Sequence, residues 1–140
     1  MAEEILYKNY RLRKDLFYTK THEWARREGN KVYVGITDYA QKKLRDIVYV
    51  EEPEIGRRVK KGEVVTTVES VKAVGEVYSP VSGTIVAWNE ELGVDPSIIT
   101  VDPYGKGWIV VIEMEDENEL KELLNVDGYI KILEKEESGH

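Results

Sequence analysis

The chain has 140 residues, the size of one ordinary domain, and 41% of them are hydrophobic, which is enough for a buried core. The 27 acidic residues exceed the 20 basic ones, and the formal net charge of −7 disfavours binding to the phosphate backbone of nucleic acid. The sequence has no cysteine and only two histidines, which excludes thiol catalysis and iron–sulfur ligation and leaves no metal site to expect.

The sequence also lacks the signals of a membrane or exported protein. No apolar run approaches the roughly 20 residues that span a bilayer, and the first ten residues resemble neither a signal peptide nor a transit peptide. We therefore expect a cytoplasmic protein with no membrane association. No interior segment has the character of a linker, so we expect a single domain over residues 1–140, with its core at about 16–126 and a charged, frayed tail at about 134–140.

The first elements in chain order are strands. Residues 3–20 are mixed in charge, and only Leu16–Thr19 has the residue types typical of a strand. The turn cluster Glu28-Gly29-Asn30 separates Thr21–Arg27 from the alternating segment Lys31–Ile36. This pattern predicts a β-hairpin.

A short helix should follow this hairpin. Asp38 lies where an N-cap residue belongs, and no helix breaker follows it, so we expect a helix near 38–45. The apolar run Asp46–Glu51 then predicts a strand, which ends before the turn-forming residues Pro53 and Gly56.

Residues 56–89 contain short β-branched segments broken by glycine or proline about every ten residues, which is typical of an all-β sandwich or barrel. Within this stretch, Gly62–Glu69 and Gly83–Glu90 align at an offset of 21 residues, matching at the glycine and at the final glutamate. The midpoint between the two segments is a predicted turn near Ser70–Gly75, and this turn carries Lys72.

The last third of the chain begins with a predicted loop after Asn89 that contains Gly93, Asp95 and Pro96. A closing strand is expected over Trp108–Glu113. A C-terminal helix is expected near 116–125, because acids occupy its first turn and leucines fall on one face.

No common catalytic signature is present. The sequence has no phosphate-binding glycine loop, no GxGxxG and no GxSxG, and His22-Glu23 is not followed by the second histidine of an HExxH motif. We therefore expect no catalytic residue and no self-sufficient enzyme.

The alternative to an enzyme is a group carrier, a domain that displays a covalently attached cofactor. Such a carrier needs a lysine at an exposed, tight turn between strands. Lys72 meets this description, because it has small neighbours and Gly75 lies nearby. From spacing alone, a lysine that only increases solubility is the simpler interpretation.

Six motifs in order resemble the H protein family of the glycine cleavage system and together extend over residues of about 16–126. They are Thr21–Trp24, Val34–Gln41, Asp46–Val50, Glu69–Ala73, Ser79–Gly83 and Asp102–Trp108. The resemblance implies a mainly β lipoyl-domain fold, a barrel-sandwich hybrid of two small antiparallel sheets. It also implies lipoate in amide linkage on Lys72, with Glu69, Ser70, Val71 and Ala73 forming the turn that a lipoate ligase or octanoyltransferase recognises.

The resemblance further implies a role as a shuttle. The lipoyl-lysine arm would take the aminomethyl group of glycine from the pyridoxal-phosphate glycine decarboxylase to the aminomethyltransferase, which passes the one-carbon unit to tetrahydrofolate. The FAD-containing dihydrolipoamide dehydrogenase would then reoxidise the arm. An arm of about a dozen bonds reaches on the order of 14 Å. We expect a monomer that visits these enzymes in turn.

In this family the loaded arm folds into a cleft on the carrier. By motif position, the residues of that cleft would be Thr21, His22, Glu23, Tyr39 and Glu76. Glu23 could pair with the cationic amine of the loaded arm. A packing role is the competing interpretation for His22 and Trp24, and anchoring of the last strand is the competing one for Tyr104 and Trp108.

Three residues depart from the family pattern: Arg45 replaces a usual glycine, Thr100 a common asparagine, and Tyr39 a frequent histidine. Two other functions stay open. The chain could be an H-like relay or storage protein that passes lipoyl or octanoyl groups to 2-oxoacid dehydrogenase subunits, or an interaction module with an unmodified lysine.

Overall fold

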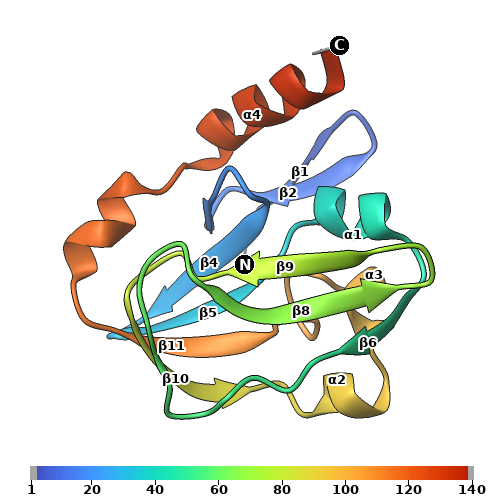
Figure 1. Cartoon of the computed structure of the whole chain (residues 1–140). Coiled ribbons are helices and arrows are strands. Elements are labelled where there is room, and N and C mark those ends of the chain that lie inside the picture. Colours follow the sequence, from blue (N-terminus) through green and yellow to red (C-terminus); the bar gives the residue numbers. More distant parts are fainter. Residues whose placement is uncertain (1–2, 139–140) are drawn as a thin grey trace.

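The computed structural model describes residues 3–138, which form a mainly β protein with short helices (Figure 1). The strands are β1 (Glu4–Tyr7), β2 (Tyr10–Arg13), β3 (Phe17–Tyr18), β4 (Glu23–Glu28), β5 (Lys31–Ile36), β6 (Ile47–Val50), β7 (Arg58–Val59), β8 (Val64–Ser70), β9 (Val74–Tyr78), β10 (Gly83–Trp88) and β11 (Val110–Met114). The helices are α1 (Asp38–Leu44), α2 (Glu91–Val94), α3 (Ile98–Val101), the 3-10 helix η1 (Glu117–Glu122) and α4 (Val126–Ser138).

All strand pairs are antiparallel, as the sequence predicts. A six-stranded sheet has the order β3-β4-β5-β11-β10-β7, and a three-stranded sheet has the order β6-β8-β9. The two predicted sheets are therefore present, and the hairpin β1–β2 adds a third. The two segments of the predicted internal repeat form β8 and β10, which lie in different sheets.

One hydrophobic cluster joins the two larger sheets. Val34 and Ile112 of the six-stranded sheet and Val68 and Val77 of the three-stranded sheet belong to it, and each is at most 1% exposed. Burial of such side chains removes apolar surface from water at about 25 cal/mol per Å². This cluster fixes the position of β8 and β9 against the larger sheet.

A second cluster attaches α4 to the N-terminal hairpin. Leu12, Tyr18, Tyr129 and Leu133 are fully buried in it, and the rings of Tyr18 and Tyr129 stack with their centroids 4.6 Å apart. Figure 1 shows α4 and the β1–β2 hairpin together above the sheets. The C-terminal helix is thereby held at the end of the molecule where α1 begins.

The predicted helix at 116–125 is wrong in extent. Asp116 caps only the short η1. Leu124 then forms a β-bridge with Tyr18 through two backbone hydrogen bonds of 2.8 Å, so the backbone at Leu124 is extended and not helical. The helix α4 starts after this bridge. Residues 134–138, expected to be a frayed tail, continue α4, since Leu133 is buried and Tyr10 donates to Glu137 at 2.7 Å. Residues 139–140 of that predicted tail lie outside the described part of the chain.

Other local predictions hold with adjusted limits. The hairpin β4–β5 and the closing strand β11 are confirmed, whereas the predicted loop after Asn89 contains the helical turns α2 and α3. The hairpin β1–β2 has strands of only four residues, and β1 has three consecutive apolar residues instead of an alternation, so the sequence signal for it is weak. Within residues 3–138, no helix is both long and apolar enough to span a membrane.

Candidate functional site

Lys72 lies at the tip of the hairpin β8–β9 and is exposed. Its backbone is held rigidly, because the Ser70 N–H donates to the Ala73 carbonyl at 2.7 Å. The Ser70 hydroxyl oxygen accepts hydrogen bonds from the N–H groups of Ala73 at 3.0 Å and of Lys72 at 3.3 Å. Within residues 3–138, the Lys72 ammonium has no hydrogen-bond or ion-pair partner. The turn therefore presents a free amine from a fixed backbone.

Strand β6 supports this turn from the side. The Val71 N–H donates to the Asp46 carbonyl at 3.1 Å, and Ile47 is paired with Ser70. Glu69, the first predicted recognition residue in β8, is exposed and pairs with Val74. Three of the four predicted recognition residues, Glu69, Val71 and Ala73, are exposed around Lys72, whereas Ser70 is buried at 5% exposure and holds the turn from within.

A cavity of about 300 Å³ adjoins the hairpin. Its walls come from the hairpin, from α1, from the turn before β4 and from α4. The lining residues are Thr21, His22, Ile36, Tyr39, Ala40, Lys43, Leu44, Val68, Gly75, Glu76, Val77 and Glu136. A Cβ at Gly75 would lie 3.3 Å from a methyl group of Leu44, so glycine keeps this wall open. The apolar side chains of α1 and β8–β9 make most of the cavity suitable for a hydrophobic group.

Four of the five predicted cleft residues line this cavity: Thr21, His22, Tyr39 and Glu76. Glu23 is not among the lining residues, because its carboxylate is turned into the protein and is 1% exposed. Its Oε1 accepts from the Thr21 hydroxyl at 2.6 Å, and its Oε2 accepts from the Tyr78 N–H at 3.2 Å. Burial raises the pKa of Glu23, although these hydrogen bonds oppose the shift. Glu23 therefore holds Thr21 at the edge of the cavity.

His22 connects the cavity to α4. It has a φ of +74°, which histidine adopts more readily than most residues. Its Nδ1 is 2.8 Å from the Tyr129 hydroxyl, and its Nε2 is 2.9 Å from the Glu136 carboxylate. Burial lowers the pKa of His22, while Glu136 opposes that shift. The Tyr129 hydroxyl also lies 2.7 Å from the Thr37 hydroxyl, so one polar chain joins α4 to the start of α1.

The sequence gives no sign that Glu136 belongs to this site, because its place depends on the docking of α4 across more than a hundred residues. Lys43 and Leu44 could have been inferred, since they lie one helical turn beyond Tyr39 and Ala40, respectively. Only the position of α1 against the hairpin shows which face of the helix lines the cavity.

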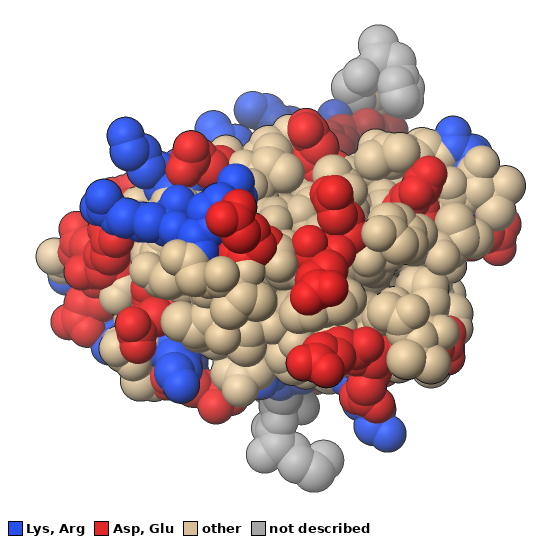
Figure 2. Space-filling model, turned by 60° about the horizontal axis from the view of Figure 1, so that its bottom comes forward, with Lys and Arg blue, Asp and Glu red and all other residues tan. Residues whose placement is uncertain are grey.

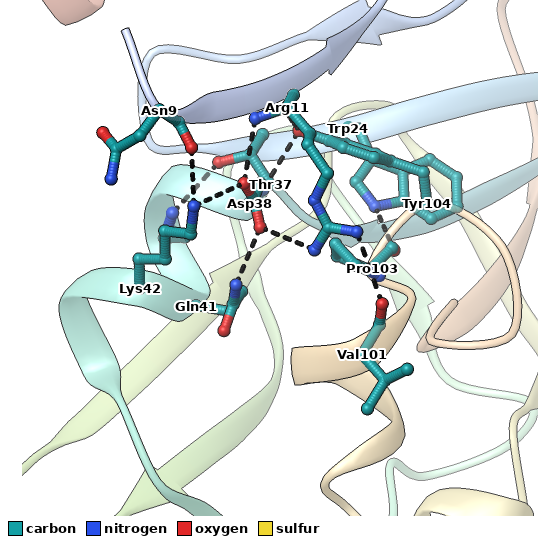
Figure 3. A network of polar contacts seen from close by, with 11 residues as sticks. Asn9, Arg11, Trp24, Thr37, Asp38, Gln41, Lys42, Val101, Pro103 and Tyr104 are labelled. Atoms are coloured by element: carbon teal, nitrogen blue, oxygen red, sulfur yellow. Dashed lines mark hydrogen bonds and ion pairs between the residues drawn. The ribbon is translucent and has the colours of Figure 1, made fainter. Parts of the chain in front are cut away.

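A buried carboxylate positions α1, as Figure 3 shows. Asp38 is the first residue of the helix, and the N-cap is Thr37, whose hydroxyl accepts from the Ala40 N–H at 3.2 Å. The Asp38 carboxylate accepts from the Arg11 N–H at 2.9 Å, from the Arg11 guanidinium at 3.0 Å and from the Gln41 amide at 2.7 Å. These contacts outweigh the burial and lower the pKa of Asp38. The Val34–Gln41 motif thus sets the start of the helix that walls the cavity.

The aromatic residues of the other motifs act as anchors. Trp24 is fully buried and donates from its indole nitrogen to the Pro103 carbonyl at 2.9 Å. Tyr104 accepts from the Asp38 N–H at 3.0 Å and donates to the Arg11 carbonyl at 2.6 Å (Figure 3). The packing role for Trp24 is therefore confirmed, and Tyr104 anchors the loop before β11 to β2 and α1.

The surface charge and the acidic side chains of residues 3–138 point to no metal site. In the view of Figure 2, acidic groups are spread over much of the surface, and basic groups gather mainly toward one side. Within the described part of the chain, no three His, Asp or Glu side chains are grouped so that they could hold a metal ion. The Lys72 hairpin and the adjoining cavity remain the strongest candidate site.

Comparisons with known proteins agree with this geometry. The family model described as "Glycine cleavage H-protein" matches residues 16–136. The glycine cleavage system H protein of Thermus thermophilus is 55% identical over 123 residues, 88% of this chain and 96% of that protein. The H protein of Thermotoga maritima is 54% identical over 112 residues, 80% of this chain and 90% of that protein. A crystal structure of a glycine cleavage system H protein from Mycobacterium marinum has a TM-score of 0.75 and 36% identity, covering 86% of this chain and 97% of that one.

Proposed function

The chain belongs to the glycine cleavage H-protein family, and from this premise we propose that it is a non-catalytic carrier with lipoate in amide linkage on Lys72. The observation that carries the proposal is the unpartnered amine at a rigid hairpin tip beside a largely apolar cavity. Glu69, Val71 and Ala73 would form the surface that a lipoate ligase or octanoyltransferase recognises, and Ser70 would hold the turn in shape through its hydrogen bonds to Lys72 and Ala73.

The residues around Lys72 fit such a group. In the attachment step, the Lys72 Nζ attacks the activated carboxyl carbon of the acyl donor, an amide bond forms, the amine loses a proton and the activating group leaves. This step needs an amine that is accessible and unpaired, and Lys72 is both within the described residues. The apolar wall formed by Leu44, Val68 and Val77 suits the hydrocarbon and sulfur atoms of the arm.

When attached, lipoate supplies a disulfide that can be reduced and can carry an aminomethyl group. We propose that the protein presents this group in turn to the pyridoxal-phosphate glycine decarboxylase, to the tetrahydrofolate-dependent aminomethyltransferase and to the FAD-containing dihydrolipoamide dehydrogenase. An arm of about 14 Å lets each enzyme reach the sulfur atoms without contacting the whole carrier.

We further propose that the cavity shelters the loaded arm. Thr21, His22, Tyr39 and Glu76 line the cavity, and Glu23 fixes the Thr21 hydroxyl. Glu76 and Glu136 are among the residues that line the cavity, so their negative charges would attract a cationic amine there and would not attract an uncharged dithiolane. This difference in contacts would favour the docked arm only when it is loaded.

The test is the exchange of bicarbonate with the carboxyl carbon of glycine, catalysed by glycine decarboxylase in the presence of the lipoylated protein. We expect wild type and Lys60→Arg to support the exchange and Lys72→Arg to abolish it while remaining folded. Lys60 is a suitable control because it is also an exposed lysine near a turn. Exchange that persists with Lys72→Arg would contradict the proposal. Transfer of lipoyl groups from Lys72 to 2-oxoacid dehydrogenase subunits, without any exchange, would indicate the relay function instead.

A further inference from the structure

A second hollow, of about 350 Å³, also borders Lys72. It is lined by Asn9, Tyr10, Lys42, Lys43, Arg45 and Lys72. Four of these six residues are basic, in a protein whose formal net charge is −7. A concentration of positive charge in an acidic protein produces a local field of opposite sign to its surroundings.

The four basic groups differ in how they are held. The Lys42 ammonium donates to the Asn9 carbonyl at 2.6 Å and pairs with Asp38 at 3.3 Å, which Figure 3 shows. The Lys43 ammonium lies 5.1 Å from the centre of the Tyr39 ring. The side chains of Lys43, Arg45 and Lys72 make no hydrogen bond or ion pair with any residue between 3 and 138. Once Lys72 is acylated, Arg45 is the cation of this hollow that has neither an ion pair nor an aromatic contact among those residues.

Of the six other arginines, five form ion pairs with carboxylates of this chain and the sixth, Arg57, donates to the Val64 carbonyl, so a guanidinium without any partner is unusual here. The five in ion pairs are Arg11, Arg13, Arg26, Arg27 and Arg58. Arg45 has 27 acidic residues in its own chain and yet pairs with none of those that the structure describes. Its charge is therefore available to a group outside the protein.

The backbone at Arg45 is also strained. This residue follows α1, and its N–H donates to the Gln41 carbonyl at 2.8 Å. Its φ of +61° and ψ of −176° fall in a region that is almost confined to glycine. A glycine could adopt this backbone conformation at the end of α1 without steric cost, so the fold does not explain why an arginine is present. An outlier of this kind points to a use for the side chain.

We propose that the basic hollow centred on Arg45 is the docking surface for the enzyme that acylates Lys72, and that carboxylates at the rim of that enzyme's active site contact it. The proposal rests on the proposed function. Enzymes that act on the sulfur atoms of the arm work up to about 14 Å from Lys72 and can leave the hollow uncovered. The acylating enzyme must bring its active site to the Lys72 Nζ itself, so its surface covers the hollow. Charge complementarity then makes an acidic rim the fitting partner.

The test measures steady-state acylation of the unmodified protein by its own lipoate ligase, with lipoate and ATP, followed by intact mass. We expect Arg45→Glu to raise the KM for the carrier about tenfold, with kcat nearly unchanged and a weaker dependence of KM on salt. Arg45→Gly should raise KM by a smaller factor, although it should also raise the melting temperature because it removes the strain. Lys31→Glu is the control, since it reverses an exposed charge at the far end of β5 from α1.

Three results would overturn the proposal. The first is a KM of Arg45→Glu equal to that of the Lys31→Glu control, with wild type acylated normally; the carrier function would then stand without this docking surface. The second is a defect confined to the glycine decarboxylase exchange, which would assign the hollow to a different partner. The third is a wild-type Lys72 that the ligase does not acylate, in which case the carrier function fails as well.

Discussion

At the scale of single residues, one close approach between a ring and a glycine shapes the sheet beneath the site. Gly35 of β5 pairs with Trp24 of β4, and the indole lies across the glycine. A Cβ at Gly35 would be 2.6 Å from the indole nitrogen, closer than such atoms can approach. The buried indole also donates to the Pro103 carbonyl, so it cannot move aside without losing that bond.

We therefore expect Gly35→Ala to lower the free energy of unfolding by about 1–3 kcal/mol through overpacking. Gly93→Ala is the matched control, because a Cβ there would lie 3.5 Å from Trp88, an ordinary contact. In helix α2 that alanine should change the free energy by less than about 1 kcal/mol. Urea unfolding of the two variants provides the comparison, and equal effects would contradict this account of Gly35.

Much at this scale could be predicted from the sequence. The turn position of Lys72 follows from the flanking β-branched segments, and its small neighbours are visible in the sequence. The predicted N-cap, Asp38, is wrong by one residue, because Thr37 and Asp38 are both suitable caps and the structure uses Thr37. The orientation of Glu23 could not be predicted, since its carboxylate accepts from the Tyr78 N–H, whose position depends on a different sheet.

At the scale of elements, the docking of α4 completes the cavity. Glu136 reaches the cavity from α4, and His22 links Glu136 to Tyr129 of the same helix. The groups that face His22 are therefore Glu136 and Tyr129 from α4, Tyr39 from α1 and Glu76 from β9 across the cavity. The charge state of His22 consequently affects how firmly α4 is held.

This arrangement predicts a pH dependence of stability. Burial lowers the pKa of His22 below its ordinary value of 6.5 in the folded state. At a pH between the folded pKa and 6.5, His22 therefore binds more protons in the unfolded chain than in the folded protein. Its contribution to the free energy of unfolding is fully present above this pH range and decreases as the pH falls through it. His22→Asn should remove this part of the dependence, and asparagine tolerates the positive φ.

The measurement is urea unfolding of wild type and His22→Asn between about pH 7.5 and 5.5, the range in which a histidine changes charge. Wild type should lose more stability than the variant as the pH falls. The difference between the two proteins isolates His22 from carboxylates such as Glu23. Parallel curves, or a steeper loss in the variant, would contradict the direction assigned to the His22 pKa.

Helices and strands with local sequence signals can be predicted, whereas those that depend on contacts between distant residues cannot. The hairpin β4–β5 has a turn cluster followed by an alternating segment, and α1 has a cap and no breaker, so local signals suffice for both. The position of α4 depends on the pairing of Leu124 with Tyr18, a contact between distant parts of the chain. A periodic pattern of leucines cannot show that such a bridge interrupts the helix.

At the scale of the whole molecule, the site draws residues from nearly the entire chain. The cavity combines Thr21 near the start with Glu136 near the end, and Lys72 lies midway between them in the sequence. Family motifs identify the lysine because its surroundings are local. They leave the cavity incomplete, because the walls meet only when the hairpin, α1 and α4 pack together.

The central claim is that Lys72 carries lipoate, and mass spectrometry tests it most directly. The protein would be produced with its lipoate ligase and lipoate, and intact and peptide masses would be recorded for wild type, Lys72→Arg and Lys60→Arg. We predict one lipoyl increment on the peptide that contains Lys72 in wild type and in Lys60→Arg, and none in Lys72→Arg. An unmodified Lys72 under conditions in which the ligase is active, or an increment on another lysine, would contradict the claim.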